Sequence, residues 1–440
     1  MPSDSDNLGS RSGSLVETHT TFQPRVFFFY FLVAIILLSL AGGLAYQQLF
    51  KSLSYHAAER VQNQRRVLVP GPRGNIYDRE GRLLVGNKPR FSVVLYLDEL
   101  RGEFRREFIE IRKNYRESGD RDIPTASQME RIARATVVQR YLDQVNAIIK
   151  RTVTLDSAGL ARHFSRELLL PYLLINDLSA EEYARLIERL PVRSPLQVYT
   201  SSTRYYPNQE AAAHTLGFVG YNVEVEAEDF PGDDLTTFKM KGSAGKDGLE
   251  LFFDATLQGE AGGTIFRVDP AGYRINPPLA RRLPVQGKNI VSSIDIDIQL
   301  VAEECLGDRT GAAVMIDVNT GEILVIASKP DRAQGEFINR ALSGLYLPGS
   351  TFKLITAIAG LRSGTLTPES TYTTDGIYVV AGRAFRDHRG CITGDIDFTK
   401  AIEHSVNTFF INYGLRTGVD NIAAEARRFG FGERTGIELP

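Results

Sequence analysis

The sequence predicts an α/β protein in three parts: one membrane-spanning helix, a mixed α+β region, and a C-terminal α/β domain. Three observations predict this. A long apolar run lies near the N-terminus, short strands and helices alternate through the middle, and a strand hairpin followed by long apolar helices lies toward the C-terminus. A chain of 440 residues is long enough for several domains.

The composition excludes some classes of protein. Charged residues make up 24% and hydrophobic residues 43% of the chain, which excludes wholesale disorder. Lys and Arg number 51 against 53 Asp and Glu, so no global charge argues for a nucleic-acid partner, and we expect none. Two cysteines, Cys305 and Cys391, are too few for a disulfide framework.

The apolar run predicts a membrane anchor. No charged residue lies between Arg25 and Lys51, and a bilayer core of ~30 Å needs ~20 apolar residues in a helix. A cleaved signal peptide is the alternative, but the run exceeds the usual apolar length and no convincing A-x-A site follows. We therefore expect a polar tail over 1–25 and a transmembrane helix over 26–46. Positive charges on both flanks leave its orientation open.

The middle of the chain predicts mixed structure. Residues 55–69 predict a helix running into a strand, and residues 71–97 predict strands with turns at 78–81 and 86–89. The charged, periodic stretch 100–166 predicts exposed helices.

Glycine and proline residues indicate where the elements of this region end. A short apolar helix is expected to end at Gly217. Residues 275–288 hold three prolines and a basic cluster, and they are the best candidate for an interdomain linker.

The last part predicts an α/β domain. A strand and then a helix opened by Asp295 or Asp297 come first, and residues 311–328 predict a hairpin around the turn 319–321. A helix is expected to start at Pro348–Ser350 and to end at Gly364.

Ser350 and Lys353 stand at the start of that helix. The i, i+3 spacing puts both side chains on one helical face. A desolvated lysine can take the proton of a serine hydroxyl, and a helix N-terminus favours negative charge nearby. A helix-capping serine and a solvated lysine remain the alternative for this fragment alone.

Ser405 and Asn407 form a second polar pair. They lie beside the apolar residues Phe409, Phe410 and Tyr413. Polar side chains next to a core need partners or a ligand. The S-V-N triplet formed by residues 405–407 is, by itself, weak evidence for an active site.

In this order, S-x-x-K and S-x-N after a hairpin form the active-serine signature of penicillin-binding proteins and serine β-lactamases. Longer stretches resemble class B penicillin-binding proteins, especially the elongation-type penicillin-binding protein 2 group. These stretches are 72–87, 247–262, 313–328 and 337–354. The resemblance runs from the membrane segment to Pro440.

The resemblance implies a bitopic inner-membrane enzyme with a cytoplasmic tail and a periplasmic body. Residues 47–290 would be a pedestal (dimerisation-type) domain, and 291–440 a transpeptidase domain with an antiparallel sheet flanked by helices. The implied reaction cross-links peptidoglycan stem peptides, needs no cofactor for acyl transfer, and is blocked by β-lactams.

The resemblance also assigns roles to residues. Ser350 would form an acyl-enzyme with the penultimate D-Ala, and Lys353 would accept its proton. Ser405 would relay a proton to the leaving amine, and Asn407 would hold the substrate amide.

One motif departs from the family. K-T-G is expected roughly a hundred residues or more beyond S-x-N, and the sequence contains none. Arg434–Gly436 reads R-T-G but stands much too early to replace it. The missing strand would supply an oxyanion donor, which typically changes rates by ~10²–10³. We expect either a fragment of an ordinary enzyme or an inactive remnant.

A structural zinc site is a further hypothesis. Some members of the resembled group bind zinc here through mixed Asp, His and Cys ligands, which would correspond to Asp375, Asp387, Cys391 and His404. Cys391 and His404 would then have exchanged types relative to that pattern. His388 is a competing ligand, and a surface loop with a buried Cys391 is the plain alternative.

Other functions stay open at this stage. The septal class B homologue is one, and a penicillin hydrolase or β-lactam sensor is another, although the long pedestal argues against the latter two. A non-enzymatic protein could act through its pedestal, binding the rod-complex glycosyltransferase and its scaffold.

Overall fold

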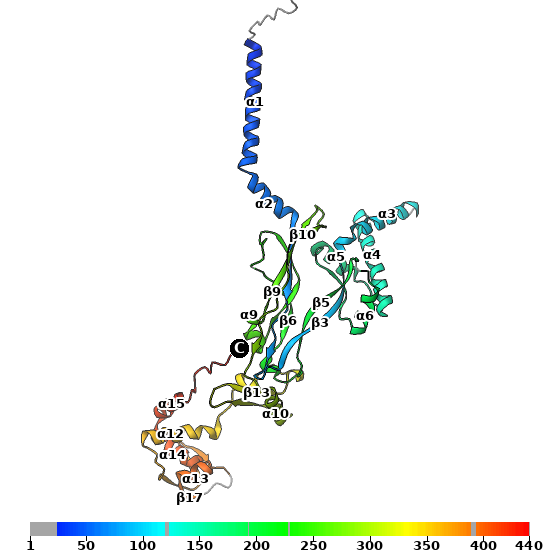
Figure 1. The fold of residues 1–440 in the computed structure, drawn as a ribbon. Coiled ribbons are helices and arrows are strands. Elements are labelled where there is room, and N and C mark those ends of the chain that lie inside the picture. Colours follow the sequence, from blue (N-terminus) through cyan, green and yellow to red (C-terminus); the bar gives the residue numbers. More distant parts are fainter. Residues whose placement is uncertain (1–23, 119–122, 192, 228, 389–392, 440) are drawn as a thin grey trace, which may run out of the picture.

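The computed structural model describes residues 24–118, 123–191, 193–227, 229–388 and 393–439. The chain is elongated, and its parts follow one another along the long axis (Figure 1). A long helix leads into two large sheets and one two-stranded sheet, here called the two-sheet region after the two large ones (residues 64–291). A smaller set of helices and hairpins follows, called the C-terminal region (residues 292–439).

Helix α1 (Pro24–Leu49) confirms the predicted apolar helix. Its Arg25–Leu49 stretch is long and apolar enough to cross a bilayer, with a mean hydropathy of 2.5 and no part buried against the rest of the chain. A short helix, α2 (Ser52–Asn63), connects it to the two-sheet region, as the sequence predicted. The polar tail expected at 1–25 lies almost wholly outside the described residues.

The first sheet is built around β1 (Gln64–Gly71). Its strand order is β10–β9–β1–β7, with antiparallel pairs except for the parallel pair β1–β7. The partners are β7 (Thr236–Lys239), β9 (Gly259–Val268) and β10 (Arg274–Arg282).

The linker expected at 275–288 is wrong, because most of it belongs to β10. Pro277 and Pro278 fall where the β9–β10 register shifts, between Ile275 and Ala280. β10 is also an edge strand. Prolines are tolerated at bulges and edges because no ladder hydrogen bond is lost there.

The second sheet follows the long strand β3 (Leu83–Leu95). Its order is β11–β2–β3–β4, and β5 pairs with β3 along residues 86–95. The other strands are β2 (Ile76–Tyr77), β4 (Tyr172–Ile175), β5 (Leu196–Tyr205) and β11 (Ile290–Val291).

The turn expected at 86–89 is also wrong, because β3 runs straight through it. Besides β5, strand β2 pairs with β3 at residues 83–85, and β4 pairs with it at residues 93–95. Between these two pairings, residues 86–92 of β3 pair with β5 alone among the described strands. Pro89, which has no backbone N–H, is tolerated there because no described strand pairs with the other edge at that point. The turn expected at 78–81 is present.

Helices pack against this second sheet in a side lobe (Figure 1). They are η1 (Leu97–Leu100), α3 (Arg101–Ser118), α4 (Ala126–Ile149), α5 (Ser157–Arg166) and α6 (Ala180–Arg189). The expectation of exposed helices holds for α3, which buries only Phe104, and fails for α4. Helix α4 buries seven residues, so the charged residues of its exposed face led to a wrong prediction for a helix whose other face packs in the core.

The two sheets meet at a buried ion-pair network. Glu250, which has no exposed side-chain surface, accepts hydrogen bonds from Arg73 at 2.6 and 3.0 Å and from Arg204 at 2.6 Å. Arg73 also reaches Asp254 at 2.6 Å. The surrounding elements are β6 (Val219–Glu224), β8 (Lys241–Gly245), α7 (Ala213–Leu216), α8 (Gly248–Phe252) and α9 (Asp254–Leu257).

The C-terminal region begins with α10 (Ile296–Leu306), capped by Asp295 as one of the two expected residues. The hairpin of β12 (Gly311–Ile316) and β13 (Ile323–Lys329) confirms the predicted one. The remaining elements are η2 (Arg332–Gln334), α11 (Arg340–Ser343), η3 (Gly349–Phe352), α12 (Lys353–Ser363), β14 (Thr371–Thr374), β15 (Ile377–Val380), β16 (Arg383–Arg386), β17 (Gly394–Asp397), α13 (Phe398–Glu403), α14 (Asn407–Thr417) and α15 (Val419–Arg428).

Helix α12 is held by α14 and α15. A separate apolar core fills this part, with Phe409 fully buried beside Val406 and Ala357. Gly364 ends α12 in a left-handed conformation, as predicted. The ends of α12 and α14 therefore have a fixed relation to each other.

We expect Arg73→Ala to destabilise the two-sheet region strongly. The change leaves the fully buried Glu250 short of a partner, and breaking a buried ion pair typically costs about 3–5 kcal/mol. Chemical denaturation would measure the free energy of unfolding. Lys113→Ala is the matched control, since its pair with Glu117 is exposed, and little change is expected there. A similar small loss in both variants would contradict a structural role for the network.

Candidate active site

Ser350 lies in η3, immediately before α12. Ser350 is exposed to solvent, and its backbone carbonyl accepts a hydrogen bond from the Lys353 N–H. The segment leading to it is also open to solvent: Leu345 and Leu347 are 100% and 96% exposed. A nucleophile at this place is accessible to a large substrate.

Lys353 brings the two sequence motifs together. It lies at the first position of α12 and is half-buried. Its Nζ donates to the Ser405 Oγ at 3.0 Å, to the Ser405 carbonyl oxygen at 2.6 Å, and to the Asn407 Oδ1 at 2.5 Å. The ring centroid of Phe410 lies 5.7 Å from the same Nζ. The polar residues that needed a partner have found it in the lysine.

Ser405 adopts an unusual backbone conformation. It lies in the connection between α13 and α14 with a φ of +52°. Non-glycine residues rarely adopt positive φ, and the strain is kept where surrounding contacts enforce it. Here Lys353 holds both the carbonyl and the hydroxyl of Ser405, so the strained residue presents its hydroxyl to the lysine.

Asn407 is the first residue of α14. Its Nδ2 donates to the Arg386 carbonyl oxygen at 2.8 Å, which leaves Oδ1 to face Lys353. The orientation of the amide is thus fixed from both ends. Lys353, Ser405 and Asn407 therefore meet between the starts of α12 and α14, and Ser350 lies in the turn just before α12.

The residues of the zinc hypothesis do not gather in the same way. Among the residues that the structure describes, no three or more His, Cys, Asp or Glu side chains form a group that could hold a metal ion. Cys391 lies outside the described residues.

The described members of the set have other contacts. Asp375 accepts from the Ile377 N–H at 3.0 Å within its own turn, and both oxygens of Asp387 bind Thr408. His404 lies on the surface, with its Nε2 3.8 Å from Glu403. Within the part of the chain that the structure describes, the zinc expectation therefore lacks support.

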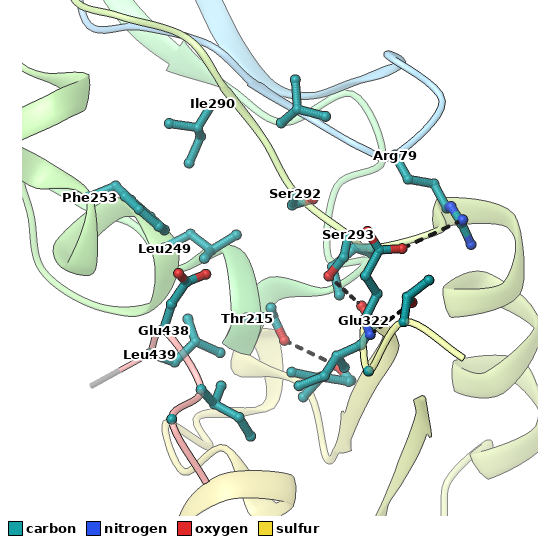
Figure 2. Close-up of a pocket in the computed structure, with 18 of the residues that line it drawn as sticks. Arg79, Thr215, Leu249, Phe253, Ile290, Ser292, Ser293, Glu322, Glu438 and Leu439 are labelled. Carbon is teal, nitrogen blue, oxygen red and sulfur yellow. Dashed lines mark hydrogen bonds and ion pairs between the residues drawn. The ribbon is translucent and has the colours of Figure 1, made fainter. Parts of the chain in front are cut away.

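A large cavity lies away from Lys353, Ser405 and Asn407, at the junction of the two regions. It encloses about 900 Å³. Figure 2 shows Leu249 and Phe253 on one side, Ser292 and Ser293 on another, and Glu438 and Leu439 from the C-terminal segment. Thr435 and Gly436 of the R-T-G stretch line this cavity. That stretch therefore faces the junction.

The junction also holds the strand that leads to Ser350. Thr215 donates to the Ile326 carbonyl oxygen at 3.1 Å, drawn as a dashed line in Figure 2. His214, which is buried, has its Nε2 3.1 Å from the Glu336 carbonyl oxygen. A neutral His214 must carry its proton on Nε2 to make this bond. Helix α7 thus holds both β13 and the loop after it.

Comparison with known families decides the identity of this fold and site. Residues 68–292 match the model of the penicillin-binding protein dimerisation domain, and residues 311–440 match that of the penicillin-binding protein transpeptidase domain. The chain belongs to the penicillin-binding protein family. Its two-sheet region is the dimerisation-domain part. Lys353 with its partners Ser405 and Asn407, here called the Lys353 cluster, lies in the transpeptidase-domain part.

Named relatives are similar over nearly the whole chain. The peptidoglycan D,D-transpeptidase MrdA of Acinetobacter baumannii is 28% identical, over 95% of this chain and 60% of the relative. MrdA of Haemophilus influenzae is 27% identical, over 93% of this chain and 61% of the relative. The chain therefore spans about three-fifths of the length of these relatives.

A solved structure supports the fold. The complex between penicillin-binding protein PBP2 and MreC from Helicobacter pylori matches with a TM-score of 0.61 and 23% identity. The match covers 86% of this chain and 67% of the other. The mixed architecture expected from the sequence, a pedestal followed by a transpeptidase domain, is thereby confirmed.

Sequence reasoning missed several residues around this site. Thr408 and Thr374 are buried behind Asn407, and their hydroxyl groups lie 2.7 Å apart. The signal was present in part, because Thr408 directly follows Asn407 and Asp387 was already singled out for its carboxylate. His214 and Thr215 carried no such signal, since only the fold brings them to β13.

We expect the stability of the junction to fall in mild acid because of His214. Burial lowers the pKa of His214, and nearby Arg332 and Arg340 lower it further, against the opposite influence of the Glu336 carbonyl and Asp331. At His214 the unfolded chain therefore binds a proton more readily than the folded chain does. The contribution of neutral His214 to folding stability is complete above the ordinary histidine pKa of about 6.5, and it is lost as the pH falls through the lowered pKa of the folded state.

Thermal unfolding between about pH 7.5 and about pH 5 would measure this loss. In His214→Gln, which keeps a side-chain donor for Glu336, the pH dependence should be weaker. His56→Gln is the matched control, because His56 is exposed on α2. Identical pH profiles for wild type and His214→Gln would contradict the assignment.

Proposed function

We propose that this protein is a peptidoglycan D,D-transpeptidase of cell-wall elongation, acting through an acyl-enzyme on Ser350. The Lys353 cluster carries the proposal, because it joins S-x-x-K to S-x-N through three hydrogen bonds. The relatives named MrdA support the elongation subtype over the septal homologue. No cofactor is required for this acyl transfer.

The first half-reaction forms the acyl-enzyme. Lys353 takes the hydroxyl proton of Ser350, and the Ser350 Oγ forms a bond to the carbonyl carbon of the penultimate D-Ala of a stem peptide. For this step the Lys353 Nζ must be unprotonated, so that its free electron pair can take the proton. The bond to the terminal D-Ala breaks, and Ser405 passes a proton to the leaving amine.

The second half-reaction forms the cross-link. An amine from a neighbouring stem peptide attacks the ester carbon and releases Ser350, which recovers its proton. Asn407 would hold the substrate amide. Its Nδ2 has two N–H groups, of which one points to the Arg386 carbonyl and the other is available to an acceptor. A β-lactam would stop the cycle as a stable adduct on Ser350.

We further propose the placement of the chain in the cell. The apolar α1 supports a single-pass anchor in the bacterial inner membrane, with residues 1–25 cytoplasmic, 26–46 spanning, and the body periplasmic. Residues 47–290 would be the pedestal and 291–440 the transpeptidase domain.

A second function concerns the pedestal alone. The two-sheet region has its own large core, formed by residues such as Leu95, Val137 and Leu186, and it folds around its own ion-pair network. The similar Helicobacter pylori protein was solved in complex with MreC. We propose that the pedestal binds a scaffold protein of this kind and the rod-complex glycosyltransferase, whether or not the catalytic site is complete.

Covalent labelling with fluorescent penicillin tests the enzymatic proposal. We expect the protein to label and Ser350→Ala to lose the label completely. Lys353→Ala should label at least ~10²-fold more slowly, because the general base is removed. Lys400→Ala on α13 is the matched control for a lost lysine and should label normally.

The outcomes separate the two functions. Labelling that persists in Ser350→Ala would overturn the assignment of the nucleophile. A folded protein that does not label but still binds a scaffold partner would leave the pedestal function and remove the enzymatic one for this chain.

A further inference from the structure

Helix α14 has no cap of its own. Its N-cap residue is Val406, which makes no side-chain hydrogen bond to the first turn. Helix starts normally carry Ser, Thr, Asp or Asn there, whose oxygen accepts from a free amide of the first turn. Since Thr408 and Phe409 have no exposed surface, water cannot easily take that place.

Asp387 supplies the missing acceptor from another part of the chain. Its Oδ1 accepts from the Thr408 N–H at 2.9 Å, and its Oδ2 accepts from the Thr408 hydroxyl at 2.7 Å. A carboxylate at this end of a helix also interacts favourably with the helix dipole. Asp387 thus caps α14 across 21 residues of sequence.

The protons of the buried hydroxyls can be assigned. The Thr408 hydroxyl donates to Asp387, so at 2.7 Å it must accept from the Thr374 hydroxyl. Thr374 in turn accepts from the Gly376 N–H at 3.0 Å. Each hydroxyl donates once, and the chain of hydrogen bonds ends on the carboxylate.

The same hairpin holds the neighbouring residue of α14. The hairpin β15–β16 is closed after Arg386 by a bond from the Asp387 N–H to the Gly376 carbonyl at 3.0 Å. Arg386 accepts from Asn407, and Asp387 accepts from Thr408. Two consecutive hairpin residues therefore hold two consecutive residues of α14, and Asn407 is directed toward Lys353.

We propose that Asp387 is a positioning residue, which caps α14 and thereby fixes Asn407 and Ser405 against Lys353. This inference rests on the proposed acylation of Ser350. It differs from the zinc hypothesis, because here the carboxylate serves the amide and hydroxyl of Thr408. The two assignments predict different behaviour for two neighbouring aspartates.

Three variants test the proposal in the full chain. Asp387→Ala removes both acceptors. Asp387→Asn keeps Oδ1 for the Thr408 amide and offers Nδ2 to its hydroxyl, yet an amide is a poor zinc ligand. Asp375→Ala is the matched control: Asp375 is exposed on the same hairpin and belongs to the zinc set, but it bonds its own turn.

The first measurement is acylation by fluorescent penicillin, resolved into a binding constant and a rate constant for the covalent step. We expect Asp387→Ala to lower the covalent rate constant by about tenfold or more, with a smaller effect on binding. Asp387→Asn should stay within about threefold of wild type, and Asp375→Ala within about twofold. Treatment with a chelator should change none of these values.

The second measurement does not depend on activity. Hydrogen exchange of the Thr408 amide should accelerate by about tenfold or more in Asp387→Ala, and remain near wild type in the other two variants. If the wild-type protein is not acylated at all, the proposed function fails, and this measurement still decides whether Asp387 caps α14. Unchanged exchange in Asp387→Ala would overturn the proposal.

Other results would also decide it. If Asp375→Ala or the chelator reproduces the effect of Asp387→Ala, a metal role replaces the cap. If Asp387→Asn is as slow as Asp387→Ala in both measurements, the cap is refuted. Should Asp387→Ala fail to fold, Thr408→Val and Thr408→Ser replace it: Val should slow acylation, Ser should restore it, and equal effects would refute the proposal.

Discussion

The carboxylate of Glu250 has no exposed surface and lies between the guanidinium groups of Arg73 and Arg204. Arg73 comes from the chain that leaves the first sheet, Arg204 from the end of β5 in the second, and Glu250 from the short helix α8. One buried charge therefore joins three segments far apart in the sequence. A buried carboxylate is tolerated only when its oxygens are paired and hydrogen-bonded, so the two sheets and α8 have little freedom to separate.

The rest of the molecule is built outward from this joint. Helix α8 lies beside α7, and α7 holds β13 through Thr215 and the following loop through His214. That loop leads to Ser350. In the C-terminal region a second polar group, the side-chain nitrogen of Lys353, plays a comparable part by holding Ser405 and Asn407. In both places one group at the centre of several hydrogen bonds fixes the geometry of the segments around it.

Where the sequence misled, proline and charge patterns were the cause. Pro89 and the prolines of 275–288 indicated breaks, but they occupy an open strand side and a register shift, where a strand tolerates them. The charged pattern of α4 indicated an exposed helix, while Val137, Leu142 and Val145 bury its other face. Local composition does not reveal the neighbouring strand or helix that decides each case.

The sequence by itself determined the apolar N-terminal helix, the β12–β13 hairpin, the end of α12 at Gly364, and the positions of the S-x-x-K and S-x-N motifs. These follow from periodicity, turn residues and spacing, which are local properties of the chain. Only the tertiary structure decided that Lys353 lies against Ser405 and Asn407, that Asp387 serves Thr408, and that the R-T-G stretch faces the junction. Those contacts join residues 20 or more positions apart, and their geometry depends on how separate elements pack.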